Sequence, residues 1–241
     1  MNLVLFDVTE IDAPLALDDP RARHLLEVLR RAPGEPFEIA QVNGPRGSAM
    51  ITSRDAHALY LAFTWLPPTA PPLRPTLIVA LPRPQTARDI LRDATTVGVS
   101  RIDFVTTERA DTNYAASRLW TTGEWRRHLL TGAAQACDPH LPAVSWHHFL
   151  ATALADRPRA TPAVALDLYE AEGPWDLAPL ESGATPPPTV VIGPERGWSA
   201  ADRTVLRAAG CRLLHLGPRV LRTETAVVAA LVLLNRPRPP A

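Results

Sequence analysis

A proline-rich segment divides this sequence into two parts that have different patterns. Residues 66–75 read LPPTAPPLRP and contain five prolines without any apolar periodicity. Proline fixes φ and keeps the backbone extended, so a helix or a central strand cannot continue through this segment. A chain of 241 residues has enough material for two domains of unequal size. We therefore expect a first domain over 1–66, a linker over 67–75 and a second domain over 76–241.

The first part contains short, mostly apolar runs that are typical of β-strands. The turn sequence NGPRG at 43–47 lies between two of these runs and predicts a hairpin-like turn. Residues 18–34 predict a short helix, with Asp18 or Asp19 as its N-cap and Gly34 as its terminator. The expected strands are LVLFDV, PFEIAQV, SAMITS and HALYLAF. The expected helix carries Arg21, Arg23, His24, Arg30 and Arg31. This part is therefore predicted to form a small β-barrel or sheet.

After the linker, expected strands alternate with expected helices, which indicates a parallel sheet covered on both faces. The expected strands are TLIVAL, RIDFV, PAVALD, TVVIG and CRLLHL. The expected helices are PQTARDILRDATTV, TGEWRRHLLTGAAQA, SAADRTVLRAA and TETAVVAALVLLN. The last of these helices is apolar almost all round, which predicts that it is buried. The second part is thus predicted to be an α/β domain whose arrangement resembles that of nucleotide-binding domains.

The charged residues exclude several kinds of chemistry. The formal net charge is zero, and all 25 basic residues are arginine because the sequence contains no lysine. A P-loop and a pyridoxal phosphate site both require a lysine, so both are excluded. Arginine presents a planar fork of donors that suits phosphate groups and base edges. Any nucleic-acid site must therefore be a local cluster of arginines.

The sequence shows no sign of a membrane segment or a metal site. No apolar run reaches the roughly 18 residues that a spanning helix needs, and MNLVLFDVTE lacks the features of a signal peptide. We therefore expect a cytoplasmic protein that has no membrane partner. Cys137 and Cys211 belong to no CxxC pair, and the adjacent His147 and His148 point in different directions on a regular element. Neither a disulfide framework nor a metal ion is expected.

Two strand-to-helix junctions near the C-terminus are candidate ligand sites, because ligands bind where the strands of open parallel sheets end. The first junction covers 190–202, where two glycines permit tight turns and Ser199 with Asp202 predicts a capping box. The second junction covers 214–231 and contains Arg219, Arg222 and Glu224. We expect this segment to be mostly buried, so these charges would need partners or a ligand. Neither junction has the spacing of a dinucleotide or P-loop motif, so the residues alone predict only a cofactor site.

The motifs at these junctions resemble those of a known family. IGPERGWS and LGPRVLRTETA closely resemble the paired C-terminal motifs of the RsmE family, which are 16S rRNA uridine-N3 methyltransferases of the SPOUT superfamily. HLLEVLR at 24–30 resembles the N-terminal motif of that family, and TTERA at 106–110 resembles its central motif. AAQACDPHLPAV at 133–144 resembles the segment that follows. The resemblance covers most of the chain, with the motifs in the family's order.

This resemblance implies a fold and a cofactor. It implies an N-terminal PUA-like β-barrel, a parallel-sheet SPOUT domain with a deep trefoil knot, and a homodimer formed largely through the knotted regions. The knot loops would bind S-adenosylmethionine, with glycines that allow close backbone approach and leucines that cover the adenine. The residues that the resemblance assigns to this pocket are Ile192, Gly193, Pro194, Gly197, Leu216, Gly217, Leu221, Thr225 and Ala226.

The implied reaction also assigns roles to charged residues. Methylation of uridine N3 places negative charge on the flanking carbonyl oxygens, and the fork of Arg222 could hold such an oxygen or a nearby phosphate. Glu195 or Glu224 could accept the proton or face the sulfonium, although both could equally compensate a helix dipole. Ribosomal RNA, or the small ribosomal subunit, would be the partner. The residues predicted to contact it are Arg21, Arg23, His24, Arg30, Arg83 and Arg109, with Arg88 as an alternative to Arg83.

The sequence leaves two alternatives open. Arg196 stands where the RsmE family usually has a second glycine. This difference would favour a non-catalytic RNA-binding or ribosome-assembly protein of the same fold. The other alternative is a knotted methyltransferase that acts on a different RNA or a different base atom.

Overall fold

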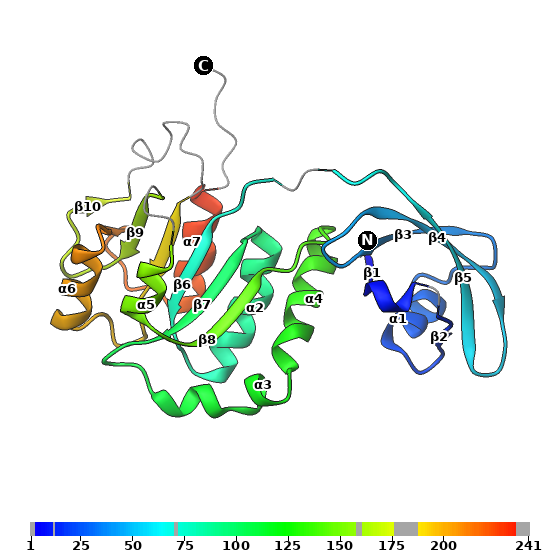
Figure 1. The fold of residues 1–241 in the computed structure, drawn as a ribbon, viewed down its shortest axis with the longest axis horizontal. Helices are drawn as coiled ribbons and strands as arrows, with labels where there is room; N and C mark the ends of the chain where they lie inside the picture. Colours follow the sequence, from blue (N-terminus) through cyan, green and yellow to red (C-terminus); the bar gives the residue numbers. More distant parts are fainter. Residues whose placement is uncertain (1–2, 12, 70–71, 158–160, 176–187, 235–241) are drawn as a thin grey trace, which may run out of the picture. The chain divides into compact units, whose positions relative to one another are not determined.

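The computed structural model describes residues 3–11, 13–69, 72–157, 161–175 and 188–234. Contacts between residues divide the chain into two compact units. Unit 1 contains residues 1–71 together with 133–141, and unit 2 contains residues 72–132 and 142–241. Figure 1 labels the helices and strands of both units.

Unit 1 is built on a five-stranded sheet in the order β1-β3-β4-β5-β2. β1 and β3 pair in parallel and the other pairs are antiparallel. The expected turn at 43–47 joins β3 to β4, and Asn43 adopts the left-handed conformation there with φ 55°. Leu25, Ile39 and Leu59 are fully buried in its core. The strands are β1 (Val4–Phe6), β2 (Leu15–Ala16), β3 (Pro36–Gln41), β4 (Arg46–Arg54) and β5 (Ala58–Trp65).

The helix of unit 1 is shorter than expected. Asp19 caps α1 (Pro20–Arg23), and the chain continues as a π-helical turn over His24–Val28. The expected helix was wrong beyond this point, because Arg30 has φ 51° and so cannot continue a right-handed helix. Arg30 and Arg31 therefore lie after the helix.

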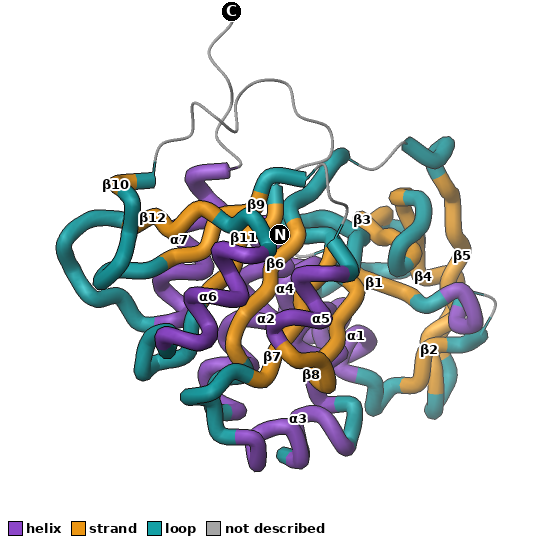
Figure 2. Tube along the Cα trace, turned by 60° about the vertical axis from the view of Figure 1, so that its left-hand side comes forward, coloured by secondary structure: helices purple, strands orange, loops and turns teal. Residues whose placement is uncertain are grey.

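Unit 2 contains a seven-stranded sheet in the order β10-β12-β9-β11-β6-β7-β8, and every pair in it is parallel. Figures 1 and 2 show α5 and α6 on one face of this sheet and α2, α4 and α7 on the other. The predicted parallel sheet with helices on both faces is therefore confirmed. The strands are β6 (Thr76–Ala80), β7 (Arg101–Thr106), β8 (Ala143–Phe149), β9 (Ala163–Leu166), β10 (Gly173–Pro174), β11 (Thr189–Ile192) and β12 (Arg212–His215). The helices are α2 (Pro84–Val97), α3 (Arg118–Thr121), α4 (Glu124–Ala136), α5 (Leu150–Ala155), α6 (Ala200–Ala208) and α7 (Thr223–Leu234).

The core of unit 2 fills both sides of the sheet. On one side, Trp198 and Leu206 pack with Ile78 and Val105 from the strands. On the other side, α7 packs against α2 and β11 and buries Val227. Burial of α7 is confirmed along one face, although Val232 is exposed. In the part of the chain that the structure describes, no helix has the length and apolar character needed to cross a membrane.

The sequence patterns missed four of the helices and strands of unit 2, namely β8, β10, α3 and α5. β8 lies at the edge of the sheet and pairs only with β7, so no strand of the sheet is hydrogen-bonded to its other side. Its sequence AVSWHHF lacks the continuous apolar run that marks a fully buried strand. α5 has only six residues, which is too short for a helical period to stand out.

Candidate functional site

A pocket of about 370 Å³ opens where β9, β11 and β12 end. These three strands are neighbours in the sheet, and their carboxyl ends lie at the same edge. Three loops follow them and form the walls of the pocket. The lining residues are Leu166, Asp167, Leu168, Tyr169, Ile192, Gly193, Pro194, Glu195, Arg196, Gly197, Trp198, His215, Leu216, Gly217, Arg219, Val220, Leu221, Thr223 and Ala226.

The loop between β11 and α6 makes the first wall. Gly197 N–H donates to the carbonyl of Pro194 at 2.8 Å and closes a tight turn. A Cβ at Gly193 would lie 3.0 Å from the ring of Trp198, so this position has no room for a side chain. The predicted capping box is confirmed, because Asp202 N–H donates to Ser199 Oγ at 3.0 Å and Ser199 N–H donates to Asp202 Oδ2 at 3.1 Å. The wall is therefore fixed to the start of α6.

The loop between β12 and α7 makes the second wall. Gly217 has φ 115°, a conformation that side chains rarely adopt, and its N–H donates to His215 Nδ1 at 3.0 Å. The expected burial of this segment was wrong, because Arg219 is exposed and Val220 is 76% exposed. Arg219, Val220 and Leu221 line the pocket and are exposed, so the charge of Arg219 is accessible to solvent.

The loop between β9 and β10 makes the third wall, which the sequence patterns did not single out. Leu166 ends β9 and its carbonyl accepts a hydrogen bond from Trp198 Nε1 at 2.8 Å. Asp167 is buried beside Arg203 of α6. Burial opposes the charge of Asp167, but hydrogen bonds, above all from Arg203, hold its pKa below the ordinary value. A carboxylate directly after a core strand was the available signal for this wall.

The comparisons with known proteins agree with this geometry. Residues 69–235 match the family described as RNA methyltransferase domain. The chain is 32% identical to ribosomal RNA small subunit methyltransferase E of Treponema pallidum, over 98% of this chain and 91% of that protein. The chain belongs to the ribosomal RNA small subunit methyltransferase E family. This assignment confirms the resemblance to the RsmE family.

Solved structures agree with the family. The ribosomal RNA small subunit methyltransferase E of Neisseria gonorrhoeae, solved bound to S-adenosyl methionine, is 26% identical with a TM-score of 0.76, and the match covers 96% of both chains. A probable rRNA-methyltransferase from Porphyromonas gingivalis has a TM-score of 0.79 at 23% identity, over 96% of this chain and 97% of that one. The second likeness concerns the fold alone.

In this member of the methyltransferase E family, the residues expected to bind the cofactor come together in space. Two loops that are separated in sequence bring most of them to one pocket. Thr225 is the exception, because it is exposed on α7 and is not part of the lining. The lining residues from the expected set are Ile192, Gly193, Pro194, Gly197, Leu216, Gly217, Leu221 and Ala226.

The three residues with expected catalytic roles lie in different places. Glu195 lines the pocket, and its Oε1 lies 3.6 Å from Arg83 Nε. Arg222 ends the loop between β12 and α7, and Glu224 lies in the first turn of α7, with Arg222 Nη1 4.0 Å from Glu224 Oε1. The side chain of Arg222 is 86% exposed, so its donors are accessible to a large substrate. Neither Arg222 nor Glu224 is part of the pocket lining.

Two of the arginines expected to bind RNA lie beside the first wall. Arg83 faces Glu195 as described above, and Arg109 Nη1 donates to the carbonyl of Arg196 at 3.0 Å. Arg88 instead pairs with Glu124, with 2.8 Å between Nε and Oε1. Arg83 is therefore better placed than Arg88 to contact a substrate at this pocket.

The candidate RNA contacts of unit 1 have different surroundings. Arg21 donates to Glu10 and Asp19, and its guanidinium lies 5.0 Å from the centre of the Phe6 ring. Burial opposes its charge, but these two carboxylates keep the pKa of Arg21 above the ordinary value. Its donors are thus directed at oxygens of its own unit. Arg23 and Arg30 are exposed and His24 is half-buried.

Proposed function

We propose that this protein transfers a methyl group from S-adenosylmethionine to N3 of a uridine in the 16S rRNA of the small ribosomal subunit. Membership of the methyltransferase E family supports the reaction class. The observation that carries the proposal is the pocket at the ends of β9, β11 and β12, which gathers the residues of both C-terminal motifs. The relative from Neisseria gonorrhoeae that was solved with S-adenosyl methionine has the same fold.

The residues of the pocket fit this methyl donor. The volume of about 370 Å³ lies in the range of small-molecule sites. The polypeptide around Gly217 leaves open space where a Cβ would stand, so a ligand can approach the backbone closely. Ile192, Leu216 and Leu221 supply apolar surface for the adenine. The bound donor supplies an electrophilic methyl group on a sulfonium.

Residues around the mouth of the pocket can handle the target base. Uridine N3 must lose its proton, and negative charge then spreads onto the two adjacent carbonyl oxygens. Arg222 holds one of these oxygens or a neighbouring phosphate, because its exposed guanidinium presents two parallel donors. Glu195 or Glu224 accepts the proton, and Glu195 has the better position because it lines the pocket.

Arginines on the same edge of unit 2 bind the RNA backbone in this proposal. Arg83 and Arg109 lie beside the first wall, and Arg196 is exposed on it. Unit 1 adds Arg23, His24 and Arg30 as candidate contacts, and Arg21 if it exchanges its carboxylate partners. Phosphate contacts release counterions, so the affinity for RNA should fall steeply as salt rises. A shallow dependence on salt would contradict these contacts.

The domain organisation and assembly implied by the family complete the proposal. Residues 1–66 form a PUA-like RNA-binding barrel, 67–75 form the linker, and 76–241 form a SPOUT domain with a deep trefoil knot. The five-stranded sheet of unit 1 and the position of β11 between β6 and β9 support this organisation. We also propose a homodimer, as the resemblance to the family implies.

The non-catalytic alternative depends on Arg196. Arg196 does not close the pocket in the structure. The residue is exposed, and the pocket that it lines has a volume of about 370 Å³. Calorimetric titration with S-adenosylmethionine, and then with S-adenosylhomocysteine, tests the point. We expect micromolar binding that Gly217→Trp abolishes, because the indole would fill the space that Gly217 leaves. Folded protein that binds neither compound, even with small-subunit RNA present, would favour the non-catalytic alternative.

The role of Arg222 needs its own test. We expect Arg222→Ala to lower kcat on small-subunit RNA by at least about tenfold while the Kd for S-adenosylmethionine stays unchanged, since loss of one charged transition-state donor commonly costs this much or more. Full turnover in Arg222→Ala would contradict the role given to this arginine.

A further inference from the structure

The third wall of the pocket ends in an aromatic side chain that the fold does not bury. Tyr169 lines the pocket, although 75% of the residue is exposed. A Cβ at Gly197 would lie 3.8 Å from Cε2 of Tyr169, so the ring lies against the turn of the first wall. Tyr169 therefore stands at the mouth of the pocket, between two of its walls.

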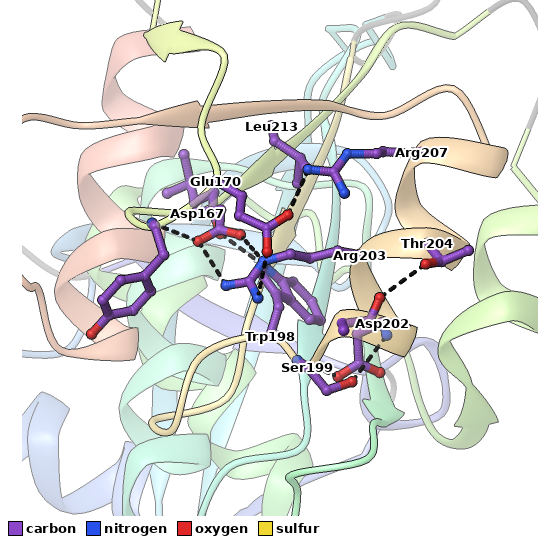
Figure 3. Close-up of polar contacts among 12 residues, drawn as sticks. Asp167, Glu170, Trp198, Ser199, Asp202, Arg203, Thr204, Arg207 and Leu213 are labelled. Carbon is purple, nitrogen blue, oxygen red and sulfur yellow. Dashed lines mark hydrogen bonds and ion pairs between the residues drawn. The ribbon is translucent and has the colours of Figure 1, made fainter.

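The backbone of Tyr169 is held by a buried ion pair. Arg203 on α6 has a side chain that is only 10% exposed, and its Nε donates to Asp167 Oδ2 at 2.5 Å. The other oxygen of the same carboxylate accepts from Tyr169 N–H at 2.9 Å. One carboxylate thus connects a helix directly to the backbone of Tyr169, as Figure 3 shows for Asp167 and Arg203.

Further contacts hold the rest of this loop. Glu170 accepts from Arg203 Nη1 at 3.2 Å and from Arg207 Nη2 at 2.8 Å. At the far end, Glu172 N–H donates to the carbonyl of Leu213 at 2.7 Å, which fixes the loop to β12. Figure 3 shows Glu170 between the two arginines. The loop is therefore tied to α6 and to β12, while the ring of Tyr169 stays exposed.

This combination is hard to explain by stability. A buried arginine and carboxylate lose hydration, and their attraction commonly does little more than offset that loss. An aromatic ring that stays exposed adds little burial to the fold. A rigid backbone under an accessible ring is instead the arrangement of a preorganised binding residue, because little conformational entropy is lost on binding.

We propose that Tyr169 binds the methyl donor by covering it at the mouth of the pocket, and that Arg203, acting through Asp167, is the positioning residue for Tyr169. This inference rests on the proposed function. It adds the loop between β9 and β10 to the two glycine-containing loops of the donor site. It also gives α6 a part in donor affinity, although Arg203 does not line the pocket.

Calorimetry with S-adenosylmethionine tests the role of Tyr169 first. We expect Tyr169→Ala to raise the Kd about tenfold, which corresponds to about 1.4 kcal/mol. Tyr169→Phe should bind like the unchanged protein, because the ring makes the contact. In RNA methylation assays, Tyr169→Ala should raise the KM for the donor and leave the KM for RNA unchanged. A Kd for Tyr169→Ala within twofold of the unchanged protein would overturn the inference.

A pair of arginines on α6 supplies the matched variants for the positioning role. Arg203→Met removes the contacts with Asp167 and Glu170, whereas Arg207→Met removes only a contact with Glu170. We expect the first change to raise the Kd for the donor about fivefold to tenfold and the second to raise it less than twofold. Asp167→Asn keeps the shape of the side chain and removes its charge, so it tests the same link if Arg203→Met does not fold.

A double-mutant cycle separates positioning from a general loss of structure. If Arg203 acts through Tyr169, then Arg203→Met should have no further effect on donor Kd once Tyr169 is alanine. Additive effects of the two changes would overturn the positioning role. If the unchanged protein does not bind the donor, both the proposed function and this inference fail. If it binds the donor and Tyr169→Ala binds equally well, only this inference fails.

Discussion

The indole N–H of Trp198 donates to the carbonyl of Leu166 at 2.8 Å. Leu166 ends β9, and Trp198 lies in the loop that follows β11, so this bond joins two walls of the pocket. Trp198 is only 1% exposed, and its ring fills the space beneath Gly193. Besides the pairing of β9 with β11, one buried side chain therefore joins these two walls.

Changing Trp198 should affect both stability and donor binding. Trp198→Phe removes the hydrogen bond but keeps much of the ring, so we expect the free energy of unfolding to fall by about 1 kcal/mol or more. Trp198→Ala should cost about 3 to 5 kcal/mol because it leaves a cavity. Urea denaturation measures the free energy of unfolding of both variants, and calorimetric titration with S-adenosylmethionine measures the loss of donor binding. Among the described residues, the half-buried Trp175 has no hydrogen-bond partner for its indole nitrogen, so Trp175→Phe is the control.

A single methyl group at Gly193 should disturb the same contact. The new Cβ would lie 3.0 Å from the ring of Trp198, so the loop or the indole must shift. We expect Gly193→Ala to lower the free energy of unfolding by about 1 to 3 kcal/mol, as other overpacked sites do. It should also weaken binding of S-adenosylmethionine. Gly173→Ala is the matched control, because a Cβ there meets nothing within 4 Å. Equal stability of the two variants would show that the loop absorbs the extra atom.

Local patterns predicted the elements whose contacts repeat along the chain. The expected helix over 84–97 has the bounds of α2, and the capping box of Ser199 and Asp202 forms as expected. These features depend on residues that are three or four positions apart. The helix beginning at Pro20 was predicted too long, because the left-handed conformation of Arg30 has no strong signal in the residue type.

The parts of the site that escaped prediction depend on distant contacts. Asp167 and Arg203 are 36 positions apart, and no local pattern reports that they meet. The exposure of Arg222 was also unexpected, because flanking apolar residues suggested burial that the path of the loop does not provide. The two C-terminal motifs could be joined into one pocket only through the resemblance to a family. Periodicity alone placed them at strand ends and went no further.

Acid should weaken the contact between α2 and α4. Arg88 of α2 and His128 of α4 both hydrogen-bond Glu124, and these bonds, above all the one from Arg88, lower the pKa of Glu124 from 4.5 to about 2. The charged form is favoured in the folded state, so its contribution is complete above pH 4.5 and is lost as pH falls toward 2. We expect Glu124→Gln to lower the denaturation midpoint at pH 6 and to converge with the unchanged protein near pH 2.

The control for this pH series is a more exposed carboxylate. In unit 1, Glu38 Oε2 lies 3.6 Å from Arg46 Nη2, and both side chains are about half exposed. Glu38→Gln should therefore change the denaturation midpoint very little. An undiminished effect of Glu124→Gln at pH 2 would mean that shape and packing, and not charge, account for the contribution of Glu124.

The two thiols should differ in reactivity. Cys211 is buried in the core beside α6, and burial raises its pKa to about 11 against a weaker opposing effect of Arg157. The thiolate is the reactive form, so Cys211 should resist a disulfide reagent such as Ellman's reagent at pH 8 until the protein unfolds. Cys137 is half-buried and should react first. Cys137→Ser should therefore show no fast phase in native buffer and one thiol in urea. A fast phase that persists in Cys137→Ser would mean that the core around Cys211 opens readily in the native state.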